Sequence, residues 1–96
     1  MIIVNQDKDE FVNFDNIMNV CVTDCDEDGF GIFAGFIVGR DDNYRGLGYY
    51  KTEERAKEVL REITRMYQET RIVYRGQANY NPVNSIDRPI YEMPKE

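Results

Sequence analysis

The fold of this chain is decided by residues 48–70, GYYKTEERAKEVLREITRMYQET. Apolar side chains recur there at the spacing i, i+3, i+4, i+7 and i+11, which is typical of a helix that packs one stripe on a core. The stripe consists of Ala56, Val59, Leu60, Ile63 and Tyr67. We expect the helix to begin near Thr52, a good N-cap residue, and to end near Thr70.

The chain before this helix has the pattern of short strands. Runs of β-branched and aromatic residues separated by turn-forming residues predict strands at 2–5, 11–14, Asn19–Asp24, Phe30–Val38 and 47–50. The stretch Phe30–Val38 is apolar on both faces, which indicates a central strand, either in the monomer or in an oligomer. Residues 39–46 are expected to form a turn, and residues 72–74 are a candidate for a sixth strand.

These elements predict an α+β fold: an antiparallel sheet of about five strands, with one long amphipathic helix packed on it. We assign residues 1–76 to this sheet-plus-helix domain and residues 77–96 to an extended C-terminal tail, because the tail holds all three prolines. Apolar residues in the tail imply that it packs on its own chain or on a neighbouring subunit. They are Val83, Ile86, Ile90, Tyr91 and Met93.

Composition excludes several classes of function. The net charge is −6, which argues against binding to nucleic acid or to an anionic membrane, because both need a positive face. The chain has no histidine, so imidazole-based catalysis is excluded and a structural zinc site is out of reach. Enzymes built on carboxylates or arginines alone remain an alternative, but no pair of acids stands out in an apolar setting, where a raised pKa would be expected. We therefore expect no enzyme, no catalytic residue, no cofactor and no metal. Cys21 and Cys25 are expected to be free thiols of a cytoplasmic protein.

The segment DCDEDG resembles the start of a calcium loop. Asp24, Asp26, Asp28 and Gly29 occupy positions one, three, five and six, but position twelve is Gly35 instead of the required glutamate. The flanking residues also predict strands and not helices. We therefore interpret the segment as an acidic β-hairpin turn, and a calcium-dependent module, whose stability a chelator would lower, is kept as an alternative.

The candidate ligand-binding residues follow the helix. They are Arg71, Tyr74, Arg75, Asn79, Tyr80, Asn81, Arg88 and Tyr91. Guanidinium groups suit phosphate, aromatic rings suit base stacking and amides suit base edges, so this mixture favours a small anionic nucleotide. The same mixture is also ordinary for a solvated tail or for a protein interface.

Three segments carry a resemblance to a known group of proteins. MIIVNQDK at the start, VNFDNI at 12–17 and YKTEERAKEVLREI at 50–63 resemble small proteins from phages and prophages of Gram-positive bacteria. The resemblance implies a meander of strands closed by one helix. It also implies an anti-defence protein similar to the Thoeris type, an oligomer that sequesters a cyclic ADP-ribose signal. The shared residues are scaffold residues, so no binding residue is carried over.

The sequence thus predicts a non-catalytic anti-defence protein that binds and sequesters a small cyclic nucleotide or ADP-ribose-type immune signal in the cytoplasm of the bacterial host. We expect a homo-oligomer, with the tail and the second face of Phe30–Val38 at its interface. The alternative is an acidic protein that occludes a basic host defence protein through the acidic residues at 24–28 and 41–42.

Overall fold

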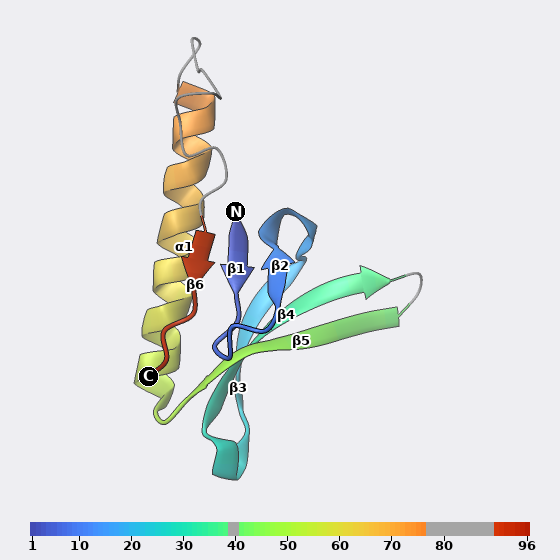
Figure 1. Ribbon diagram of the computed structural model, residues 1–96, viewed down its shortest axis with the longest axis vertical. Coiled ribbons are helices and arrows are strands. Elements are labelled where there is room, and N and C mark those ends of the chain that lie inside the picture. The colour runs from blue at the N-terminus through green and yellow to red at the C-terminus, as the bar shows by residue number, and fades with distance from the viewer. Residues whose placement is uncertain (39–40, 77–89) are drawn as a thin grey trace.

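The computed structural model describes residues 1–38, 41–76 and 90–96 (Figure 1). Their side chains are described as well, except at 37–38, 41–42 and 70–76. The elements are, in order, β1 (Ile2–Val4), β2 (Phe11–Asn13), the 3-10 turn η1 (Phe14–Asn16), β3 (Asn19–Asp24), the 3-10 turn η2 (Asp26–Asp28), β4 (Phe30–Val38), β5 (Asp41–Tyr50), α1 (Glu53–Gly76) and β6 (Ile90–Glu92).

The described strands form two three-stranded sheets, so the prediction of one sheet of about five strands is wrong. One sheet has the order β2-β1-β6 and the other has the order β3-β4-β5. The division falls at η1, where the Asn13 side chain accepts a hydrogen bond from the Asp15 N–H at 3.1 Å. This turn leads the chain away from β2, and β3 pairs with β4 instead. The fold class remains α+β.

The C-terminal residues 90–96 pack on their own chain and contribute a strand that the sequence reading did not predict. β6 pairs in parallel with β1, with Ile3 opposite Tyr91. The Met93 N–H then donates to the Val4 carbonyl at 3.0 Å, and the Met93 side chain is buried. Residues 77–89 lie outside the described parts, so the predicted domain boundary at residue 76 stays a prediction.

The second sheet is built on the long strand β4. Its bounds and those of β3 agree with the sequence prediction. β5 begins at Asp41 and not at residue 47, so most of the expected turn at 39–46 is strand. Pairing with the apolar β4 holds these polar residues in the sheet, and a bulge opposite Ile32 and Phe33 leaves Leu47 buried.

Helix α1 is capped as predicted but is longer than expected. The Arg55 N–H donates to the Thr52 hydroxyl oxygen at 3.1 Å. The helix continues to Gly76, so residues 72–74 are helical and the candidate sixth strand there is wrong. No glycine or proline interrupts the run from Glu53 until Gly76, where glycine favours termination. In the described part of the chain, no helix is long and apolar enough to cross a membrane.

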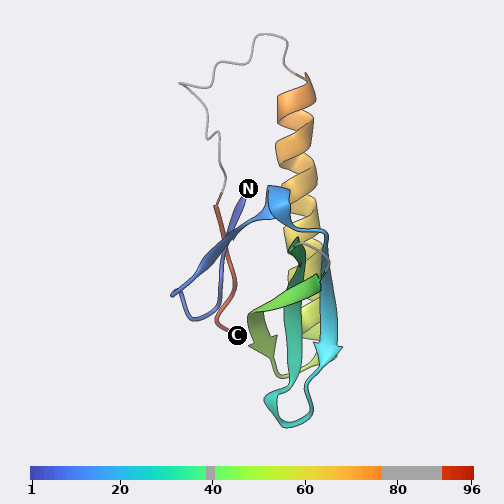
Figure 2. The ribbon, with the colours of Figure 1, turned by 90° about the vertical axis from the view of Figure 1, so that its right-hand side faces the viewer.

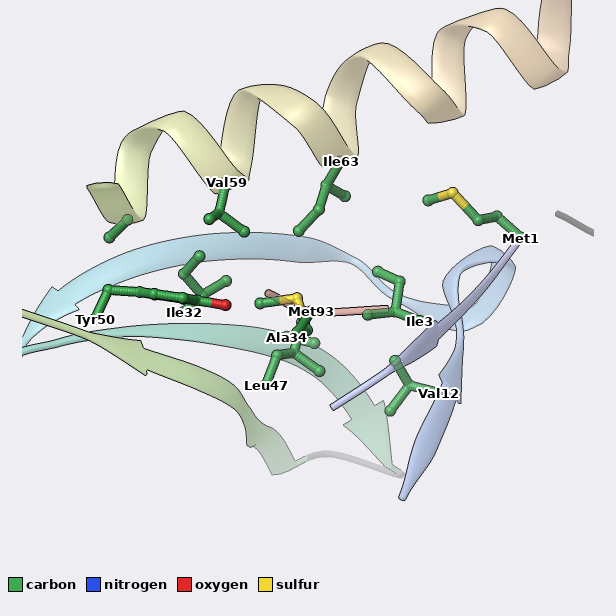
Figure 3. Packing of buried hydrophobic residues seen from close by; sticks show 11 residues of the cluster. Met1, Ile3, Val12, Ile32, Ala34, Leu47, Tyr50, Val59, Ile63 and Met93 are labelled. Carbon is green, nitrogen blue, oxygen red and sulfur yellow. The ribbon is translucent and has the colours of Figure 1, made fainter. Parts of the chain in front are cut away.

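The hydrophobic core lies between α1 and the two sheets (Figures 2 and 3). Its buried members are Met1, Ile3, Val12, Ile32, Ala34, Leu47, Tyr50, Ala56, Val59, Ile63 and Met93. Three of the predicted stripe positions are thus fully covered. Leu60 is half-buried, and the Tyr67 ring packs on Phe14 with centroids 4.5 Å apart. One core shared by both sheets explains how a chain this short holds two of them.

Candidate functional site

The residues predicted to bind a ligand fall mainly outside the side chains that the structure places. Arg71, Tyr74 and Arg75 belong to the last turns of α1, and only their backbone is described. Asn79, Tyr80, Asn81 and Arg88 lie outside the described residues. A ligand site built on this set therefore stays a prediction.

Tyr91 is the one member of that set with a described side chain. It is half-buried and donates its hydroxyl to Glu62 Oε2 at 2.6 Å. Burial raises the pKa of the Tyr91 hydroxyl well above its ordinary value, and the hydrogen bond to Glu62 and the charge of that carboxylate raise the pKa further. The hydroxyl is therefore already used within the fold, and it joins β6 to α1.

The described residues form an open groove where the two sheets meet. Its volume is about 830 Å³, within the range of small-molecule sites. The β1–β2 hairpin and η1 supply one wall, and β4 and β5 supply the other. The lining residues are Asn5, Glu10, Asn16, Phe36, Asn43, Tyr44, Arg45 and Gly46. The groove brings together asparagines, aromatic residues and one arginine from segments that are far apart in the sequence.

An ion pair crosses this groove. Arg45 Nη1 donates to Glu10 Oε2 at 3.0 Å, and the two side chains are 60% and 40% exposed. Exposed pairs of this kind contribute about 0–1 kcal/mol to stability. The guanidinium has five N–H donors, so most of its donor capacity remains for a ligand.

The asparagines of the groove have different roles. Asn5 is committed to the β1–β2 turn, because its Nδ2 donates to Asp9 at 2.7 Å and its Oδ1 accepts the backbone N–H groups of Asp9 and Glu10. Asn16 and Asn43 are exposed. The structure shows no hydrogen bond from either amide to another described residue, so both can donate to and accept from a ligand.

A smaller recess of about 380 Å³ continues the groove along β2. It shares Glu10, Asn16, Phe36 and Arg45 with the groove and adds Phe11, Val12 and Asn13. Phe11 is 65% exposed and Phe36 is half-buried. The recess thus places apolar surface beside the polar groups of the groove, the combination that ligand sites use.

A second hollow, of about 740 Å³, lies beside the C-terminal residues. Gln6 is one of the residues that line it. Gln6 Nε2 donates to the Tyr49 carbonyl at 3.0 Å and to the Lys95 carbonyl at 2.7 Å, and Gln6 Oε1 accepts the Tyr49 N–H at 2.8 Å. These bonds use both ends of the amide, so we assign this hollow a structural role.

The acidic segments lie at opposite ends of β4. Asp24 pairs with Phe30 and Asp41 pairs with Val38, a separation of roughly 26 Å at about 3.3 Å per residue. The DCDEDG segment forms the β3–β4 turn, in which Asp24 Oδ1 accepts the Asp26 N–H at 2.9 Å and Gly29 adopts φ +88°. The described residues contain no cluster of acidic, cysteine or histidine side chains that could hold a metal ion.

The thiols are free, as expected. Cys21 and Cys25 are both half-buried and unbridged, and the Cys25 thiol donates weakly to the Thr23 carbonyl at 3.6 Å.

The sequence analysis did not predict the groove, although the sequence contains a run of residues that could have indicated it. The run Asn43-Tyr44-Arg45 has the same residue types as the predicted site after the helix, but it lay in a segment interpreted as a turn. Its partner Glu10 is 35 residues away, and only the pairing of β1 with β2 and of β4 with β5 brings the two together. Comparison with protein-family models, curated proteins and solved structures gave no match for this chain.

Proposed function

We propose that this protein is a non-catalytic binder of a small anionic nucleotide and that the groove between the two sheets holds the ligand. The observation that supports the proposal is the convergence of Arg45, Asn16 and Asn43 on an open groove with an apolar wall. Following the phage resemblance, the role is sequestration of a cyclic nucleotide or ADP-ribose-type immune signal in the cytoplasm of the bacterial host.

Each group in the groove has a role that its chemistry suits. The guanidinium of Arg45 pairs with a phosphate, and the amides of Asn16 and Asn43 bind the edge of the base. Phe36 and Phe11 supply apolar surface for the face of the base. The phosphate takes over the Arg45 contact from Glu10, and giving up that exposed pair costs about 1 kcal/mol or less.

Within the same proposal, the residues predicted after the helix are a second candidate for the phosphate site. Arg71, Arg75 and Arg88 would hold phosphates there, and Tyr74 or Tyr80 would stack on the base. The two locations use the same chemistry but different residues, so substitutions separate them.

Thermal unfolding in the presence of cyclic ADP-ribose, ADP-ribose and cyclic di-AMP tests the proposal. A ligand at a hundred times its Kd stabilises the folded state by about 2.7 kcal/mol, which for a domain of this size raises the Tm by roughly 10 °C or more. We expect Arg45→Gln to abolish the rise. Arg61→Gln is the matched control, because Arg61 is exposed on α1.

Two results would contradict the proposal, one for nucleotide binding itself and one for the location of the site. If none of the three nucleotides raises the Tm, nucleotide binding is wrong. If the rise survives Arg45→Gln but is lost in Arg75→Gln, the ligand binds at the end of the helix and the groove assignment is wrong.

A second candidate function rests on the acidic β3–β4 turn, whose carboxylates are exposed at the tip of one hairpin. They belong to Asp24, Asp26, Glu27 and Asp28. In this alternative the turn occludes a basic surface of a host defence protein. Replacing Asp26, Glu27 and Asp28 by Asn, Gln and Asn should then abolish inhibition of the host, whereas Arg45→Gln should leave it intact.

A further inference from the structure

Among the described strands, β2 is one edge of the sheet β2-β1-β6 (Figure 1). The Glu10 carbonyl accepts the N–H that follows β1 at 2.9 Å, and the Phe14 N–H donates to the Met1 carbonyl at 2.9 Å. Main-chain groups alternate in direction along an antiparallel pair, so those of Phe11 and Asn13 face away from β1. Asn13 is also the N-cap of η1, and the first turn there uses its carbonyl. Three groups that no described strand pairs with therefore face outward: the N–H and carbonyl of Phe11 and the N–H of Asn13.

The edge at β2 lacks the common devices that prevent another strand from pairing with it. Such devices are a proline, a lysine or a bulge in the edge strand, or a segment that covers it. β2 pairs with β1 in one continuous register, and it contains neither proline nor lysine. An open recess of about 380 Å³ runs along it. The main-chain groups of this edge are therefore accessible to an extended chain.

A strand added beside β2 would find apolar surface on both of its faces. Side chains alternate between the faces of a strand, and residues opposite each other share a face. The side chain opposite the buried Val12 would enter the recess and lie on the half-buried Phe36. The side chain opposite Phe11 would lie on the other face, beside a ring that is 65% exposed. The edge thus suits a strand with alternating apolar residues.

The charges around β2 are mostly negative. The residues before and after the strand carry four carboxylates and one ammonium group: Asp7, Lys8, Asp9, Glu10 and Asp15. Arg45 also faces the recess, but it is paired with Glu10 at 3.0 Å. Neither Asp9 nor Asp15 forms an ion pair with a described residue. These two carboxylates lie beyond opposite ends of β2, so they favour a partner with basic residues at both ends.

A second copy of this chain does not fit the edge. Antiparallel pairing of two β2 strands about a two-fold axis at Val12 would place Asp9 of each copy at the level of Asp15 of the other. Like charges opposite each other destabilise paired strands, and this contact would contain two such pairs. The partner that the edge fits is therefore a segment of a different protein, with the opposite charge.

We propose that β2 accepts an extended basic segment of another protein as a fourth strand of its sheet. The segment runs antiparallel, the more stable arrangement per residue. It has an apolar residue opposite Val12 and a lysine or arginine at the levels of Asp9 and Asp15. Main-chain bonds supply affinity in this mode of recognition, and alternate side chains supply specificity. The recess shares Phe36 with the groove, so a bound segment and a bound nucleotide would exclude each other.

NMR titration with an acetylated and amidated peptide, Lys-Thr-Val-Leu-Val-Thr-Lys, tests the proposal. The peptide places its leucine opposite Val12 and its lysines at the levels of Asp9 and Asp15. A contact with one short strand is small and binds weakly, so the titration extends to about 1 mM peptide. The largest amide shifts should fall on the edge and the recess, at Phe11, Asn13, Asn16, Phe36 and Arg45. No nucleotide is present, so a failure here leaves the proposed nucleotide binding unaffected.

Methylated peptides separate main-chain pairing from side-chain contact. In the proposed register the valine N–H groups face Phe11 and Asn13, whereas the leucine N–H faces away from β2. Methylation of both valine nitrogens should weaken binding about tenfold or more. The peptide methylated at the leucine nitrogen is the matched control and should bind like the parent. Replacing both lysines by glutamate should also weaken binding, because the flanking carboxylates then repel the peptide.

Variants of the protein test the same contact from the other side. Phe11→Pro and Phe11→Thr both remove the ring, but only proline removes the outward N–H, and an edge strand tolerates proline there. We expect Phe11→Pro to bind the peptide about fivefold more weakly than Phe11→Thr does. Asp15→Asn should weaken binding about twofold to fivefold, and Asp28→Asn, in the β3–β4 turn, should not change it. Circular dichroism confirms that each variant is folded.

Three results of the titration overturn the proposal. They are the absence of shifts at the highest peptide concentration, shifts confined to another surface, and equal binding of the parent and the valine-methylated peptide. Sedimentation velocity of the free protein adds a fourth. A dimer that persists in Phe11→Thr but dissociates in Phe11→Pro would show that a second copy occupies the edge, and this too overturns the proposal.

Discussion

Tyr91 in the last strand donates its hydroxyl to Glu62 in the middle of the helix, at 2.6 Å. This bond connects β6 to α1 across a sequence separation of 29 residues. Two further bonds hold residues 94–96: the Tyr50 hydroxyl donates to the Pro94 carbonyl at 2.8 Å, and Arg55 Nε donates to the main-chain oxygen of Glu96 at 3.0 Å. Residues 90–96 are thus part of the folded body that positions both sheets.

Removing the Tyr91 hydroxyl should weaken this connection. Tyr91→Phe is expected to lower the free energy of unfolding by about 1–2 kcal/mol, because the half-buried Glu62 carboxylate loses a charge-assisted hydrogen bond. Urea unfolding measures the change. Tyr44→Phe is the matched control, since its ring is 56% exposed. Equal effects of the two substitutions would mean that the Tyr91–Glu62 bond contributes nothing.

Alkaline pH should destabilise the fold through two tyrosines. Burial raises the pKa of Tyr50 from 10.0 to about 12, and the pKa of Tyr91 is raised for the same reason and by Glu62. The unfolded chain therefore loses these protons first, so stability is full below pH 10 and falls between about pH 10 and 12. Urea unfolding across this range should show a shallower decline for the double variant Tyr50→Phe, Tyr91→Phe. An unchanged slope would contradict the assignment.

The Gln6 amide should contribute more to the free energy of unfolding than is usual for a side chain in a turn. Gln6→Ala removes the bonds to Tyr49 and Lys95 and leaves their backbone groups without these partners, so we expect a loss of about 1–3 kcal/mol. Gln68→Ala, at an exposed position of α1, should change stability by less than about 0.5 kcal/mol. Thermal unfolding of both variants checks the difference. A loss in Gln6→Ala no larger than in the control would show that solvent replaces the amide.

Met93 provides a test of whether the C-terminal residues belong to the core. Met93 is 3% exposed whereas Met18 is 63% exposed. Met93→Ala should cost about 2–4 kcal/mol through lost burial and a cavity, and Met18→Ala should cost less than about 1 kcal/mol. Chemical denaturation compares them directly. If the two losses are alike, residues 90–96 do not close the core in solution.

Local patterns in the sequence were sufficient to predict the elements that have strong periodicity or clear turn residues at their ends. The stripe on α1 and the Thr52 cap are set by neighbouring residues, and β3 and β4 are bounded by clear turn residues. Pairing between distant strands is not encoded locally, so the division into two sheets at η1 and the addition of β6 beside β1 could not be inferred. The strand at 47–50 was predicted, but the first part of β5 was missed because Asp41–Gly46 has a polar composition, and only pairing with β4 makes these residues a strand.

The residue types of the candidate site could be predicted from the sequence, but the location of the site in the fold could not. The reasoning that arginine, tyrosine and asparagine together suit a nucleotide applied to residues 71–91, most of whose side chains lie outside the described part of the chain. The same reasoning applies to Asn43-Tyr44-Arg45, but the groove exists only because the β1–β2 hairpin brings Glu10 to Arg45 at 3.0 Å.

Native mass spectrometry tests the nucleotide-binding account most directly. The protein is purified from bacteria that express a signalling defence system and from a plain host, as wild type, Arg45→Gln and Arg61→Gln. We predict a stoichiometric added mass of several hundred daltons on the wild type and on Arg61→Gln from the defence-expressing cells, and none on Arg45→Gln. No added mass on any sample, or the same added mass on Arg45→Gln, would contradict ligand capture in the groove.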